Sequence, residues 1–162
     1  MSTILYHSFV CIFACVSFSI IFNAPRHELI FCGINGFLSW FAYSICIQEF
    51  GFSITVSTAI AAMCITIFAR FASFHRQVPA TLYHIAGIMP LVPGTAIYNT
   101  MQAAVQGHII ETYSYLLDVV KYAGGIGIGS IMILALPYGV FEVIPRRTRK
   151  FGYRKKSSAK KQ

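Results

Sequence analysis

The sequence predicts an all-α integral membrane protein with about five transmembrane helices, the fourth of which is broken at a P-x-x-P-G motif. Composition is the first reason: 56% of the residues are hydrophobic and 11% are charged, whereas about 25% of the residues of ordinary soluble domains are charged. The second reason is that the apolar residues gather into runs of the roughly 20 residues with which a helix crosses a bilayer. Open strands are excluded there because lipid offers unpaired backbone groups no partner.

Five uncharged apolar runs nearly fill the chain, at residues 3–22, 29–47, 52–69, 81–105 and 122–141. The first has no preceding Lys or Arg and no following small-residue cleavage pattern, so we expect a span and not a secretory signal. The second follows Glu28, the third ends before Arg70, and the fourth contains the break. Because the connections are short, we expect residues 1–145 to form one helical membrane domain and residues 146–162 a basic cytoplasmic tail.

The basic residues indicate the orientation of these spans. Arg26 lies in the first connection, Arg70 and Arg76 follow the third run, and nine of the 13 basic residues lie in the tail, whereas the second and fourth connections have none. The positive-inside rule then predicts a multi-pass protein of the cytoplasmic (inner) membrane, with its N-terminus outside and its C-terminus in the cytoplasm. A basic tail beside a last span typically anchors to the lipid bilayer, and no nucleic-acid partner is expected.

The break in the fourth run removes two hydrogen-bond donors. Pro90 and Pro93 have no N–H group, so a continuous helix would leave the carbonyls of Ala86 and Met89 without partners. Gly94 adds backbone freedom directly after the second proline. We therefore expect two half-helices around an unwound centre, with the unpartnered carbonyls turned toward a cation or an ammonium group.

The second half-helix is the predicted substrate site. Its first N–H groups, around Gly94 and Thr95, are free and lie at the positive end of the helix dipole, which attracts a carboxylate. Many secondary transporters build a substrate site from such discontinuous helices near the bilayer midplane. A polar stripe continues from it along one helix face: Thr95, Asn99, Gln102 and Gln106. We expect this stripe to line the substrate path, although hydrogen bonding to a neighbouring helix explains it equally well.

Other polar and small residues are weaker candidates for function. His84, six residues before Pro90, has a side chain suited to relaying protons, but a structural role is at least as compatible with it. Asp118 and Lys121, spaced i and i+3, form either a coupling or gating pair or an ion pair at the membrane interface. Gly125 and Gly129 form G-x-x-x-G, which is typical of close helix packing in membranes.

The sequence contains no pattern typical of an enzyme. H-E-x-x-H, Walker and G-x-S-x-G motifs are missing, and the five acidic residues are scattered along the chain. The five cysteines fall within the apolar runs and lack metal-ligand spacing. We therefore expect no catalytic residues, no metal and no cofactor.

Two segments resemble a known family. FNAPRHELIFCGINGF (22–37) and VPATLYHIAGIMPLVPGTAIYNTM (78–101), together with the five-span layout, resemble the small subunit of the split threonine/serine exporter family, which also includes a two-component succinate exporter. The resemblance covers about residues 22–141, and the family's signature maps onto Pro90, Pro93 and Gly94. It implies that the chain is one half of a secondary transporter, which exports a small carboxylate substrate on an ion gradient together with a larger membrane subunit.

Three functions follow from these observations. The leading hypothesis is a subunit of an exporter of threonine or serine, with Asn99 and Gln102 lining the path of the substrate. The first alternative is export of succinate or a related dicarboxylate, although this chain has Asn35 and no cation where some family members have His or Arg near positions 35–39, so that nothing there would match a second carboxylate. The second alternative is a non-transporting membrane scaffold that binds its partner through Gly125 and Gly129.

Overall fold

The computed structural model describes residues 2–136, and every regular element in that range is a helix. The elements are α1 (Ser2–Ile21), the 3-10 turn η1 (Arg26–Glu28), α2 (Leu29–Gln48), α3 (Ile54–Arg76), α4 (Ala80–Ile88), the 3-10 turn η2 (Met89–Leu91), α5 (Gly94–Val105) and α6 (Ile109–Leu134). Among these residues, α1, α2, α3 and α6 are long and apolar enough to cross a membrane, and α4 with α5 makes a fifth span if the bent pair is counted as one. The predicted all-α membrane class is confirmed.

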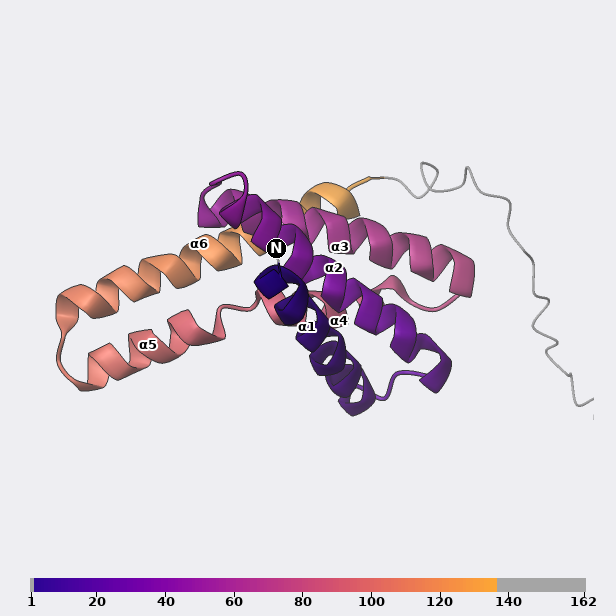
Figure 1. The fold of residues 1–162 in the computed structure, drawn as a ribbon, viewed down its shortest axis with the longest axis horizontal. Coiled ribbons are helices and arrows are strands. Elements are labelled where there is room, and N and C mark those ends of the chain that lie inside the picture. Colours follow the sequence, from indigo (N-terminus) through magenta and orange to yellow (C-terminus); the bar gives the residue numbers. More distant parts are fainter. Residues whose placement is uncertain (1, 137–162) are drawn as a thin grey trace, which may run out of the picture.

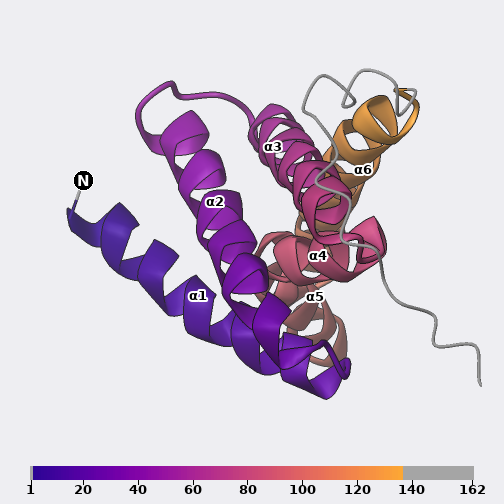
Figure 2. The same cartoon turned by 90° about the vertical axis from the view of Figure 1, so that its right-hand side faces the viewer.

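The helices form a body and an arm. In the body, α1 and α2 make a hairpin, α3 lies beside α2, and the short helix α4 packs against α2 and α3 (Figure 2). The second half of α6 runs along α3. Helix α5 and the first half of α6 form a two-helix hairpin, here called the arm, which projects from the body (Figure 1). Within the described chain the arm is therefore mostly uncovered.

Small residues set the close approach of α1 to α2. Gly36 faces Cys15, and a Cβ atom added at Gly36 would collide with the Cys15 sulfur. One turn earlier, a Cβ atom added at Gly33 would lie 2.9 Å from a methyl carbon of Ile12. Membrane helices associate through such small-residue faces, because lipid supplies no hydrophobic force that would drive them together.

Small residues also allow the close approach of α6 to α3. A Cβ atom at Gly125 would collide with the Thr58 hydroxyl, and one at Gly129 would collide with the backbone carbonyl of Ala59. The G-x-x-x-G face is thus occupied by a helix of the same chain. At the other end of this contact, the buried Arg70 of α3 donates hydrogen bonds to the carbonyls of Leu134 and Leu136, where α6 ends.

Helix α6 is longer than the uncharged run at residues 122–141, which we expected the fifth span to contain. It begins at Ile109, thirteen residues before this run, and only residues 106–108 connect it to α5. The search for uncharged runs excluded this part because of Asp118 and Lys121, yet its apolar residues keep helical spacing: Ile109, Ile110, Tyr113, Leu116, Leu117 and Val120. Residues 137–141 of the predicted span and the predicted tail at 146–162 lie outside the described residues.

Candidate substrate site at the broken helix

The chain changes direction between Ile88 and Gly94. Helix α4 ends at Ile88, η2 follows, and α5 starts at Gly94 with its axis bent by 50° from that of the preceding helix. Val92 between them has extended backbone angles, and the Gly94 N–H group bonds back to the Val92 carbonyl at 2.8 Å. The bend lies where the two prolines remove donors from the helix.

The carbonyls on the α4 side of the bend have donors from within the chain. The Ala86 carbonyl accepts a hydrogen bond from the Cys15 thiol at 3.2 Å, and the Met89 carbonyl accepts one from the Val92 N–H group at 3.3 Å. We expected both carbonyls to be free for a cation or an ammonium group, and this expectation is wrong. The physical reason is that the Cys15 thiol on α1 reaches the first carbonyl, and that the 3-10 turn η2 provides a donor for the second.

The first N–H groups of α5 are only partly free. We expected the Gly94 N–H group to be free, and this is wrong because the tight turn bonds it to the Val92 carbonyl. The first hydrogen bond of α5 runs from the Ile97 N–H group to the Pro93 carbonyl at 3.0 Å. Among the described residues, no acceptor bonds to the N–H groups of Thr95 and Ala96. Two unpaired donors therefore lie at the positive end of a 12-residue helix, a combination that favours an anion.

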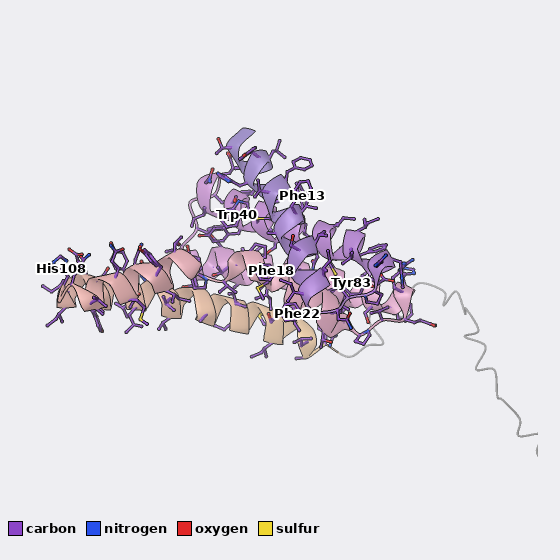
Figure 3. All side chains as sticks on the ribbon, turned by 90° about the horizontal axis from the view of Figure 1, so that it is seen from below. Phe13, Phe18, Phe22, Trp40, Tyr83 and His108 are labelled. Atoms are coloured by element: carbon purple, nitrogen blue, oxygen red, sulfur yellow. The ribbon has the colours of Figure 1, made fainter. Side chains whose placement is uncertain are left out.

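A cavity of about 90 Å³ borders this helix start. Its lining comes from four elements: Trp40, Tyr43, Pro90, Leu91, Val92, Pro93, Thr95 and Tyr122. The Tyr43 and Tyr122 hydroxyls, from α2 and α6, are hydrogen-bonded to each other at 2.7 Å. Figure 3 shows Trp40 at the place where the arm joins the body, far from His108 at the tip of the arm. Pro90, Pro93 and Thr95 are thus brought together with three aromatic rings that the sequence analysis did not assign to the site.

The polar stripe on α5 has little cover within the described chain. Asn99 is half-buried, Thr95, Gln102 and Gln106 are exposed, and Ala103 is the buried residue of this helix. Large apolar side chains of α5, namely Ile97, Tyr98, Met101 and Val105, are also exposed. Contacts among residues 2–136 explain neither face of α5.

The other predicted residues lie away from the cavity. His84 is half-buried, and its Nδ1 atom lies 3.3 Å from the Thr66 hydroxyl of α3. Asp118 and Lys121 form an ion pair of 2.9 Å on the arm. None of the three is among the residues that line the cavity at the break.

A buried ionic cluster at the start of α2 was not predicted from the sequence. The Glu28 side chain is 1% exposed; it accepts hydrogen bonds from Arg76 Nε at 3.0 and 3.1 Å and from the Tyr83 hydroxyl at 2.6 Å. His27 Nε2 lies 3.2 Å from the same carboxylate. The signal in the sequence was that Glu28 directly precedes the second apolar run and that Arg76 follows the third. We used Glu28 only to mark the start of a run and Arg76 only to predict the orientation.

Tyr83 links this cluster to the broken helix. Its backbone carbonyl accepts a hydrogen bond of 2.8 Å from the Asn35 side chain, which is fully buried. Gly87 leaves the space that Asn35 occupies, since a Cβ atom there would collide with the Asn35 amide nitrogen. Helix α4 is thereby fixed to α2 and α3 immediately before the bend.

The family model described as "Threonine/Serine exporter, ThrE" matches residues 7–136. A "Probable threonine/serine exporter" of Mycobacterium tuberculosis (strain ATCC 25618 / H37Rv) is 29% identical over 94 residues, which are 55% of this chain and 18% of that protein, so the chain spans under a fifth of this relative's length. No solved structure matches. The helices suited to membrane spanning and the match over most of the chain agree, and the chain belongs to the threonine/serine exporter family of membrane transporters.

Proposed function

We propose that the chain is a subunit of a secondary exporter of the inner membrane that moves threonine or serine, with the substrate carboxylate bound at the start of α5. One observation carries the proposal: Thr95 lines a cavity in the middle of a bent helix pair, and among the described residues no acceptor bonds to its N–H group or to that of the following Ala96. Pro93 and Gly94 create this helix start, and Asn99 and Gln102 continue the path along α5. Such half-helix N-termini hold anionic substrate groups in other secondary transporters.

A larger membrane subunit completes the transporter in this proposal. A helix with both polar and apolar faces exposed is unfavourable in lipid, because polar groups there need hydrogen-bonding partners. Helix α5 is such a helix, since Gln102 and Met101 are both exposed. This chain matches 18% of the relative, and the proposal assigns the helices that would cover the arm to the larger subunit.

Uptake into inside-out membrane vesicles tests the function, because inversion turns export into uptake. Vesicles that contain this chain and the co-expressed larger subunit should accumulate labelled threonine on an imposed proton gradient. The double variant Pro93→Ala, Gly94→Ala should reduce accumulation to background while still inserting, since it restores helix-forming residues at the break.

The matched control is Gly124→Ala. Apart from the adjoining turns of α6 itself, none of the described residues lies within 4 Å of a Cβ atom added at Gly124, so we expect uptake at the wild-type rate. Normal uptake by the double variant would refute the site assignment. Labelled succinate is measured in parallel, and accumulation of succinate in place of threonine would assign a dicarboxylate as the cargo.

A further inference from the structure

The cavity at the break has an aromatic wall with no charge. Trp40 and Tyr43 come from α2, with ring centroids 5.6 Å apart, and the Tyr122 ring of α6 lies 6.1 Å from that of Tyr43. Eight residues of the described part of the chain line the cavity, and none of them is charged. The cavity is also several times larger than the roughly 10–15 Å³ that one water molecule requires, so it has room for a small polar group.

The chemistry of this wall favours a cation. Aromatic rings attract ammonium groups through their negative faces, and the attraction is strongest for Trp and in water-poor sites. The hydrogen bond between Tyr43 and Tyr122 uses one hydroxyl hydrogen and one lone pair, which leaves further lone pairs on both oxygens to accept N–H donors. An anion would find none of the basic side chains that normally bind it.

We propose that Trp40, Tyr43 and Tyr122 form the ammonium subsite of the substrate. The inference rests on the proposed function, since it adds a second contact to the carboxylate site at Thr95 and Ala96. The two ends of a zwitterionic amino acid would then be recognised by two different helices, α2 with α6 at the ammonium group and α5 at the carboxylate. A dicarboxylate is rejected at this subsite because its second carboxylate would lie there as an unpaired charge.

Transport kinetics test the subsite on the complete exporter in inside-out vesicles. Trp40→Leu removes the strongest π system, and we expect the KM for threonine to rise about tenfold with little change in the maximal rate. Trp40→Phe keeps a ring and should stay within about threefold of wild type. Phe13→Leu, at an exposed aromatic residue of α1, is the matched control and should change neither constant.

A second measurement uses the protein itself as the probe. Trp40 is the one tryptophan of the sequence, so the emission of the purified full-length chain in lipid nanodiscs reports this wall directly. Ethanolamine has an ammonium group and no carboxylate, whereas 3-hydroxybutyrate is threonine without its amino group. We expect ethanolamine to change the emission saturably, and 3-hydroxybutyrate and succinate to leave it unchanged.

The outcomes separate this inference from the proposed function. If threonine is transported and Trp40→Leu leaves its KM unchanged, the ammonium subsite is refuted and the exporter function stands. If the wild-type exporter moves no threonine, the proposed function fails, and the emission titration decides about the subsite alone. A saturable response to ethanolamine then supports an amine subsite for another cargo, and no response, or an equal response to succinate, overturns it.

Discussion

At the scale of single residues, the buried carboxylate of Glu28 is the clearest stabilising feature outside the proposed site. Its partner Arg76 lies 48 residues away in the chain and is 35% exposed, while Tyr83 reaches the same carboxylate from α4. One side chain therefore connects the start of α2, the end of α3 and the start of α4. Because α4 leads directly into the bend, we expect Glu28 to hold the broken helix in place.

The substitution Glu28→Gln tests whether Glu28 holds the broken helix in place. The substitution keeps the shape but removes the charge, and we expect a loss of about 1.5–3 kcal/mol of stability, the range for hydrogen bonds to charged groups. The matched control is Glu111→Gln on the arm, where the carboxylate is 62% exposed and should contribute under about 1 kcal/mol. Thermal unfolding in detergent measures both. If the Glu28→Gln and Glu111→Gln variants had equal melting temperatures, the buried Glu28 carboxylate would stabilise the protein no more than an exposed one does.

Local chemistry explains which site residues the sequence could predict. The loss of donors at Pro90 and Pro93 follows from the residues themselves, so a bend at this place was expected. The Cys15 thiol on the Ala86 carbonyl and the Glu28–Arg76 pair were not predicted, because both depend on which helices become neighbours. The position of the Tyr122 ring beside the break was not predicted for the same reason.

At the scale of elements, glycine faces decide how the helices pair. Gly125 and Gly129 bring α6 against Thr58 and Ala59 of α3, so the face proposed for a scaffold partner is filled from within the chain. The motif predicted a close helix contact, but it contains no information on which helix supplies the other side. The uncharged run at residues 122–141 covers only part of α6, because the search for such runs stopped at the charged Lys121, although helical spacing continues back to Ile109.

A leucine at Gly129 should separate the α3–α6 pair. The new side chain would meet the backbone of Ala59, which cannot move as a flexible side chain can, and we expect a cost of at least about 1–3 kcal/mol. Gly127→Leu is the matched control on the same helix, since no atom of residues 2–136 outside the adjoining turns of α6 lies within 4 Å of a Cβ atom added there. The fraction of monodisperse protein after heating should fall for the first variant only. Comparable losses for both would contradict the packing role of Gly129.

At the scale of the whole molecule, contacts among the described residues do not account for the direction in which the arm leaves the body. Gly125 of α6 already lies opposite Thr55 and Thr58, near the start of α3 at Ile54, so the preceding residues of α6 extend beyond that helix. They contact α5, and both helices leave the body together (Figure 1). The sequence predicted neither the arm nor its direction, because the angle at the break depends on the packing of α4 and α6.

Photo-crosslinking tests whether the larger subunit covers this arm. A benzophenone amino acid placed at Tyr98 or Met101, which are 66% and 67% exposed on α5, should form an adduct with the larger subunit when the two are co-expressed. Phe13 on α1 is equally accessible at 74% and serves as the control, where we expect adduct at background level because the proposal places the partner on the arm. An adduct of twice this chain's mass would assign the arm to a second copy. If Tyr98, Met101 and Phe13 all gave background only, α5 would face lipid, and its exposed polar stripe would then have to be hydrated by a water path and not by a protein partner.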